Sequence, residues 1–288
     1  MNEMREARVK CLSSAGFHHM AYTEWGDPAN PKVLVCVHGL TRSGRDFDSL
    51  AQALADEYRV VCPDVAGRGR SDWLRDKALY AVPQYCADMT NLLARLGAEQ
   101  VDWVGTSMGG LIGMALAAQQ ETPIRKIVLN DVGPVITAAS LARIGDYLGI
   151  APRFESVDQA EAFIRLISAT FGSHTDAQWR HLTTHVVRTA ADGKVEFVYD
   201  PGIAHPFRQA QAASGGKDIE LWSVYDAMRC PTLLLRGELS DLLTRDAAAQ
   251  MEKRGPHACL VEFSGIGHAP TLMALDQITA VRTFLLGT

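Results

Sequence analysis

The sequence lacks the features of membrane-spanning, disordered and nucleic-acid-binding chains. No run of about 18 apolar residues occurs, so no helix is expected to cross a bilayer. The net charge is only −5, from 28 basic and 33 acidic residues, so we expect neither nucleic acid nor a membrane surface as partner. Apolar residues make up 47% of the 288 positions, enough to form a sizeable core. The sequence therefore predicts a folded, soluble protein.

The first residues do not predict an export signal. The opening MNEMREARVK alternates in charge and contains no apolar stretch of the kind that directs secretion. Cys36 and Cys62 lie in apolar runs typical of buried strands, where a thiol behaves as a small hydrophobic side chain. The six cysteines are Cys11, Cys36, Cys62, Cys86, Cys230 and Cys259. We expect all of them to be reduced and the protein to be cytoplasmic.

Short apolar runs alternate with longer helical patterns along most of the chain. Nearly continuous hydrophobicity, typical of parallel strands covered on both faces, is found at 32–37, 58–62, 101–105, 125–130, 231–236 and 258–263. Helical patterns lie at 46–55, 83–96, 107–120, 244–253 and 271–286. This alternation predicts an α/β fold with a mainly parallel, doubly wound sheet. Two earlier segments, near 7–12 and 17–25, are predicted as an antiparallel hairpin at its edge.

The alternation stops between Gly133 and about Asp226. Helical patterns there cover 136–148, 156–171 and 175–190, and one strand-like segment, KVEFVYD, covers 194–200. A gap this long inside a compact α/β domain requires structure of its own. We therefore expect a core formed by 1–132 and 227–288, and a mostly helical cap inserted at 133–226.

The most informative local pattern is GTSMGG at 105–110, between a predicted strand and a predicted helix. In such a G-x-S-x-G turn the backbone is strained, and close approach requires very small residues at Gly105 and Gly109. The turn exposes the hydroxyl of Ser107, the candidate nucleophile. It also places the amide of Met108 at a helix N-terminus, where it can donate to an oxyanion. The alternative is a glycine-rich helix start that serves packing alone.

A serine hydroxyl becomes a good nucleophile only when a base accepts its proton. His268 lies in the glycine-rich segment SGIGHAP, directly after a predicted strand. Parallel strands end at one edge of the sheet, where open α/β sheets bind ligands, so we expect His268 beside Ser107. The alternative for His268 is a solvated loop histidine. His38, at the end of another strand, is expected to be structural.

The base in turn needs a carboxylate that fixes its tautomer and stabilises the imidazolium. Asp241, in RGELSD, follows the strand at 231–236 and gives the chain order Ser–Asp–His that is typical of this turn. Asp131, in LNDVGP, ends the preceding strand at the same edge and is the alternative. The sequence favours Asp241.

A second oxyanion donor is expected from the loop HGLTR after the first parallel strand. Gly39 allows a sharp turn there, and the amide of Leu40 is the natural partner of the Met108 amide. The glycines of the later segment DVAGRGRS, at 64–71, indicate a compact structural loop.

Arg42 lies two residues beyond the proposed donor Leu40. Its planar, permanently charged guanidinium would suit a substrate carboxylate at the mouth of a pocket. The alternative is a surface ion pair with Asp46 or Asp48.

Two further patterns predict no ligand. His181 and His185 have metal-ligand spacing, but the zinc-protease pattern also needs a glutamate beside the first histidine, so we interpret them as a solvated helix face. SGGKD, at 214–218, lacks the remaining residues of a phosphate-binding loop. Neither a metal nor a cofactor is therefore expected.

Five segments together resemble the α/β-hydrolase fold superfamily, in its capped branch: VCVHGL, DVAGRGRS, GTSMGG, RGELSD and GIGHAP. The resemblance covers 17–287, almost the whole chain. It implies a complete catalytic set: Ser107 as nucleophile, His268 as base, Asp241 as acid, and the amides of Leu40 and Met108 as oxyanion hole.

The same resemblance narrows the activity. Dehalogenases and epoxide hydrolases of the superfamily carry aspartate where Ser107 stands, and carbon–carbon hydrolases of the meta-cleavage type usually carry tryptophan where this chain has Ala269. The sequence therefore favours a cofactor-free serine hydrolase that cleaves a small carboxylic ester through an acyl-enzyme, in an apolar pocket under the cap. The alternatives are an enol-lactonase, a carbon–carbon hydrolase, an acyltransferase or a non-catalytic ligand receptor.

Overall fold

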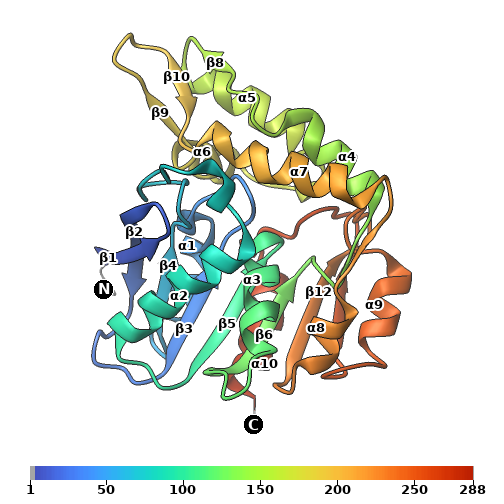
Figure 1. Ribbon diagram of the computed structural model, residues 1–288. Helices are drawn as coiled ribbons and strands as arrows, with labels where there is room; N and C mark the ends of the chain where they lie inside the picture. The colour runs from blue at the N-terminus through green and yellow to red at the C-terminus, as the bar shows by residue number, and fades with distance from the viewer. Residues whose placement is uncertain (1–3, 288) are drawn as a thin grey trace.

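The computed structural model describes residues 4–287, in which a central sheet lies between two layers of helices (Figure 1). The order of its eight strands is β1-β2-β4-β3-β5-β6-β12-β13. They span β1 (Arg5–Ser13), β2 (Gly16–Trp25), β3 (Val33–Val37), β4 (Arg59–Pro63), β5 (Val101–Thr106), β6 (Ile124–Asn130), β12 (Thr232–Gly237) and β13 (Cys259–Phe263). The β1–β2 hairpin is antiparallel, and β2 pairs antiparallel with β4. The other pairs are parallel, which confirms the predicted fold class.

Helices cover both faces of the sheet. They are α1 (Asp48–Leu54), α2 (Val82–Leu96), α3 (Met108–Ala117), α8 (Trp222–Ala227), α9 (Arg245–Met251) and α10 (Leu275–Leu286). Neighbouring strand residues point to opposite faces, so Val35 packs in the cluster with α2 and α3, and Leu34 packs in the cluster with α1 and α10. This two-sided burial explains why the strand sequences are apolar without alternation. None of the described helices has the length and hydrophobicity that a membrane crossing needs.

The segment between β6 and β12, which we call the inserted segment (133–226), adds no strand to the central sheet. Its α-helices and strands, up to the start of α8 at Trp222, are β7 (Val135–Ile136), α4 (Ala138–Tyr147), β8 (Arg153–Phe154), α5 (Val157–Ile167), α6 (Asp176–Thr184), β9 (Val187–Thr189), β10 (Val195–Phe197), α7 (Ala204–Ser214) and β11 (Ile219–Glu220). In Figure 1 the helices α4–α7 and the strands β8–β10 lie above one edge of the sheet.

Part of the inserted segment differs from the prediction. The helix expected at 175–190 ends at Thr184, because 187–189 pairs as β9 with β10 in a small antiparallel sheet. Helix α7 was not predicted. The strand-like segment at 194–200 does form a strand, β10, but its partners are β8 and β9.

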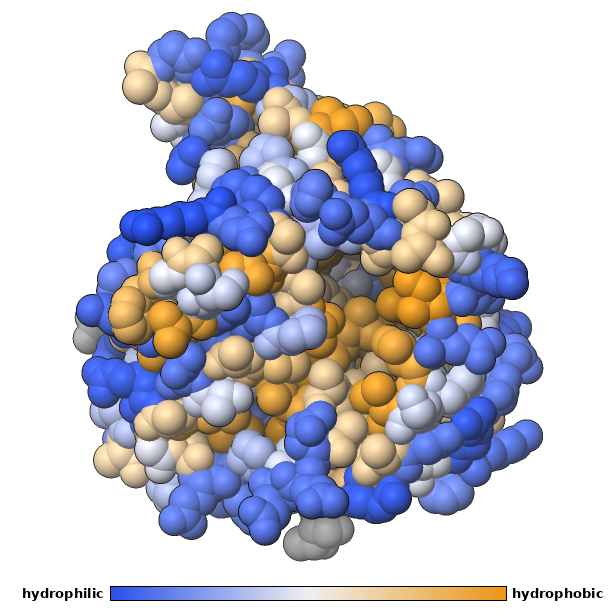
Figure 2. Space-filling model, viewed as in Figure 1, coloured by the Kyte–Doolittle hydropathy of each residue, from blue (hydrophilic) through white to orange (hydrophobic). Residues whose placement is uncertain are grey.

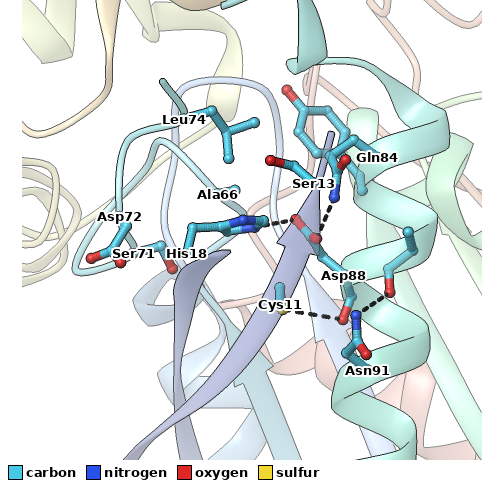
Figure 3. Close-up of polar contacts among 12 residues, drawn as sticks. Cys11, Ser13, His18, Ala66, Ser71, Asp72, Leu74, Gln84, Asp88 and Asn91 are labelled. Carbon is cyan, nitrogen blue, oxygen red and sulfur yellow. Dashed lines mark hydrogen bonds and ion pairs between the residues drawn. The ribbon is translucent and has the colours of Figure 1, made fainter. Parts of the chain in front are cut away.

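Two histidine–aspartate pairs attach adjacent residues of β2 to other parts of the core, one buried and one exposed. His18 Nε2 lies 3.1 Å from Asp88 Oδ2 of α2, with the side chains 5% and 0% exposed (Figure 3). Gln84 Nε2 donates to the other carboxylate oxygen of Asp88 at 2.7 Å. His19 Nδ1 lies 3.2 Å from Asp72 Oδ2, with side chains 45% and 42% exposed. The buried pair thus joins the hairpin to α2.

We predict that Asp88→Ala lowers the free energy of unfolding by about 3 kcal/mol, because it leaves His18 buried without its partner. Asp72→Ala, the matched exposed change, should cost about 1 kcal/mol or less. Urea unfolding followed by circular dichroism measures both values. Equal losses in the two variants would show that burial of the first pair contributes nothing.

Candidate active site

Ser107 lies on the sharp turn between β5 and α3, with φ 52° and ψ −115°. A positive φ is strained for serine. The turn is held by a hydrogen bond from Ser107 N to Asn130 O at 3.0 Å. A Cβ on Gly105 would lie 2.3 Å from Gly109 O, and a Cβ on Gly109 would lie 2.0 Å from Val37 O. These two contacts explain why the turn requires both glycines.

A continuous chain of hydrogen bonds connects Ser107, His268 and Asp131. His268, in the loop between β13 and α10, has Nε2 3.0 Å from Ser107 Oγ. On the other side of the ring, Nδ1 lies 2.7 Å from Asp131 Oδ2. With Nδ1 donating to the carboxylate, Nε2 is free to accept the Ser107 proton. The structure thus brings together the predicted nucleophile and the predicted base.

The carboxylate in this chain is not the one that the sequence favoured. Asp241 is half exposed and forms an ion pair with Arg143 of α4, whose Nη2 donates to Oδ1 at 3.0 Å. Asp131 is fully buried and directly follows β6, with φ 55°. The prediction that Asp241 contacts His268 is therefore wrong, and the alternative, Asp131, occupies that position.

Asp131 is oriented by the loop that follows β12. Gly237 N donates to Asp131 Oδ1 at 2.9 Å, and Ser240 Oγ donates to Oδ2 at 2.6 Å. Ser240 Oγ also accepts a hydrogen bond from Leu243 N at 3.1 Å. The RGELSD segment therefore does contribute to the site, through Ser240 rather than through the neighbouring Asp241. Sequence reasoning missed this role of Ser240.

The two predicted oxyanion donors belong to segments that border Ser107. Met108 is the first residue of α3, so its amide is one of the N–H groups that have no acceptor within the helix. Leu40 follows Gly39, and a Cβ on Gly39 would lie 3.7 Å from Ser107 Cβ. The loop after β3 therefore passes directly beside the serine.

Residues 32–272 match the profile of the alpha/beta hydrolase fold. The chain belongs to the α/β-hydrolase fold family. It is 51% identical over 284 residues to a 3-hydroxybutyrate-oligomer hydrolase of Cupriavidus necator, a match that covers 97% of each chain. Two solved structures each cover 99% of both chains: an alpha/beta hydrolase from Novosphingobium aromaticivorans (37% identical, TM-score 0.86) and a protein from Rickettsia typhi (31% identical, TM-score 0.90). These findings make the chain a serine hydrolase of the esterase type.

In this hydrolase the Arg42 guanidinium is held by an ion pair and by a hydrogen bond to the inserted segment. Its Nε and Nη2 donate to the two carboxylate oxygens of Asp46 at 2.7 and 2.6 Å. Nη2 also donates to Leu182 O of α6 at 3.0 Å. The expectation that Arg42 binds substrate stays a prediction. The ion pair with Asp46 was the alternative, and the bond to Leu182 joins the loop after β3 to the inserted segment.

His181 and His185 also lie at this junction rather than on a solvated helix face. Their ligand-type atoms and that of Asp48 lie within 4.8 Å of one another. However, His181 Nε2 lies 3.0 Å from Arg45 O, and the Arg45 guanidinium donates to both oxygens of Asp48. Burial, with the nearby Arg45 charge, lowers the pKa of His185 to about 4. The Asp48 carboxylate is thus already paired with the Arg45 guanidinium.

His38 is structural, as predicted. Its Nε2 accepts a hydrogen bond from Val65 N at 2.9 Å, and its Nδ1 donates to Gly39 O at 2.7 Å. Burial lowers the pKa of His38 to about 3, and the Arg68 charge acts in the same direction. The neutral ring therefore joins the loop after β4 to the loop that carries Leu40.

We predict that His38 makes the folded protein sensitive to acid. The unfolded chain protonates this histidine below its ordinary pKa of about 6.5, whereas the folded protein keeps it neutral down to about pH 3. The unfolded state therefore binds more protons in this window, and stability falls as the pH falls. In His38→Asn the free energy of unfolding should fall less steeply as the pH is lowered. The slope should be smaller than that of the wild type by up to about 1.4 kcal/mol per pH unit. Urea titrations at several pH values measure the two slopes, and equal slopes would contradict the assignment.

Proposed function

We propose that this hydrolase cleaves carboxylic esters with Ser107 as nucleophile, His268 as general base and acid, and Asp131 as the carboxylate that orients the imidazole. The observation that carries the proposal is the hydrogen-bonded chain from Ser107 Oγ through His268 to Asp131. Ser107 attacks the carbonyl while Nε2 takes its proton, and the imidazolium then gives that proton to the leaving alcohol. Water attacks the acyl-enzyme by the same route and releases the acid. The amides of Leu40 and Met108 stabilise the oxyanion in both steps.

Asp131→Asn should lower kcat about 10⁴-fold, because asparagine favours the wrong tautomer of His268. Asp241→Asn, the matched control, should retain most of the activity, since Asp241 pairs with Arg143. Hydrolysis of a chromogenic short-chain ester measures both variants, with Ser107→Ala as the baseline. A larger loss in Asp241→Asn than in Asp131→Asn would return the role of the acid to Asp241.

We further propose that residues 133–226 act as a cap over a core of 1–132 and 227–288. Support comes from contacts between this segment and the loop of the base, since Gly267 N donates to Thr170 O at 2.6 Å. His174 Nε2 also lies 2.8 Å from Thr271 Oγ1. Figure 2 shows a hollow bordered by apolar residues between the inserted segment and the core. A cap so placed would set the preference for the acyl and alcohol groups.

For the substrate we propose linear oligoesters of a short hydroxy acid, of which 3-hydroxybutyrate is the first candidate. The support is the 51% identity, over 97% of both chains, to a hydrolase of 3-hydroxybutyrate oligomers. Each link in such an oligomer is a carboxylic ester, the bond that an activated serine cleaves. We also propose that the protein acts in the cytoplasm, where free thiols such as its six cysteines are typical.

The substrate proposal is tested with the dimer and trimer of 3-hydroxybutyrate against ethyl butyrate, which has the same acyl length. We expect kcat/KM to be at least about tenfold higher for the oligomers, an advantage of about 1.4 kcal/mol in the transition state. Chromatography of the released acid measures the rates, and Ser107→Ala should release none. Equal rates for both ester types would refute the oligomer preference and leave the ester hydrolysis intact.

A further inference from the structure

Arg68, in the loop that follows β4, is completely buried, and its guanidinium pairs with no acidic side chain in the part of the chain that the structure describes. Its side chain is 0% exposed. Among residues 4–287, its hydrogen-bond partners are two carbonyl oxygens, one phenol and one thioether, all uncharged. A buried charge without a counter-charge is expensive unless the fold or the chemistry uses it. The position of this cation therefore needs a physical reason.

The guanidinium contacts both residues whose amides form the proposed oxyanion hole. Nε donates to Leu40 O at 2.8 Å, and Nη2 lies 3.4 Å from Met108 Sδ. These residues belong to separate elements, the loop after β3 and the start of α3. The Arg68 side chain thus contacts both the loop after β3 and the first turn of α3.

The other face of the guanidinium is held by aromatic side chains and its own loop. Nη1 donates to Tyr85 Oη and to Ala66 O, both at 2.8 Å. The carbon at the centre of the guanidinium lies 5.0 Å from the ring of Tyr85 and 5.7 Å from that of Tyr80. Tyr80 Oη in turn donates to Asp200 Oδ2 of the inserted segment at 2.6 Å. Only a planar group with several fixed N–H directions can make all these contacts at once.

We propose that Arg68 is a positioning residue for the oxyanion hole: it fixes the Leu40 loop against the first turn of α3, and its unpaired charge favours the anionic intermediate. This inference rests on the proposed function, because it assumes that the Leu40 and Met108 amides bind the oxyanion. The positioned amides and the positive charge both stabilise negative charge on the substrate oxygen, and this charge develops only as the ester reacts. Arg68 should therefore lower the energy of the transition state and leave ester binding unchanged.

The test compares Arg68→Met, which removes the charge and the fork, with Arg68→Lys, which keeps only the charge. Arg68→Met should lower kcat about 10²-fold, as loss of an oxyanion donor does, with KM changed by no more than about threefold. Arg68→Lys should recover part of that loss. The affinity for an alkyl boronic acid, which forms a tetrahedral anion on the serine, should fall in proportion to kcat/KM. Arg59→Met, at the opposite end of β4 and paired with Glu24, is the matched control and should leave all three values near those of the wild type.

Unchanged kcat in folded Arg68→Met would overturn the proposal, and so would a loss confined to KM or an unchanged affinity for the boronic acid. Near-ultraviolet circular dichroism and the melting temperature show whether each variant is folded. If Arg68→Met does not fold, Arg68→Lys decides the matter: the proposal requires a fall in its kcat without a matching change in KM, and wild-type kcat refutes it. Activity that persists in Ser107→Ala would instead refute the proposed function itself, so the two failures are distinguishable.

Discussion

The hydrogen bond between His268 Nδ1 and Asp131 Oδ2 is the interaction on which the rest of the site depends. It orients the imidazole so that Nε2 faces Ser107, and it lies where four adjacent strands of the sheet, β5, β6, β12 and β13, end. Ser107 follows β5 and Asp131 follows β6. Ser240 follows β12 and holds Asp131, and His268 follows β13. Parallel strand order thus arranges the chemical groups in sequence along one edge.

The strain at this edge is concentrated where the chemistry is. Ser107 and Asp131 both have positive φ values, which are uncommon for residues other than glycine. Each directly follows a buried strand, so the sheet fixes the backbone on one side while the turn projects the side chain toward His268. Such strained conformations persist only when the surrounding structure determines them strongly. Here the close backbone packing at Gly105 and Gly109 does so for Ser107.

Much of this arrangement could be predicted from the sequence, because it depends on local patterns. Continuous apolar runs indicated the parallel strands, and the glycine spacing around Ser107 indicated the turn. The acid could not be decided in this way, because Asp131 and Asp241 both follow strands that end at the same edge. What separates them is distance along the chain. Asp131 directly follows its strand, whereas Asp241 lies four residues beyond Gly237, where its side chain reaches Arg143 of the inserted segment.

Long-range partners account for the other differences between sequence and structure. Arg42 was open to two interpretations, and its pairing with Asp46, four residues away, was visible in the sequence, but its bond to Leu182 was not. The strand at 187–189 likewise forms because β10 pairs with it, against the helical pattern of its own residues. The loops of the site and the inserted segment are therefore positioned together, by contacts that only the folded chain reveals.

The most direct test of this account is a crystal structure of the protein after reaction with an alkyl fluorophosphonate. We predict phosphorus bonded to Ser107 Oγ and a phosphoryl oxygen about 2.7–3.1 Å from the amides of both Leu40 and Met108. His268 should remain hydrogen-bonded to Asp131, and Asp241 should remain paired with Arg143. An adduct on another residue, a phosphoryl oxygen away from these amides, or a His268 ring paired with Asp241 would contradict the account.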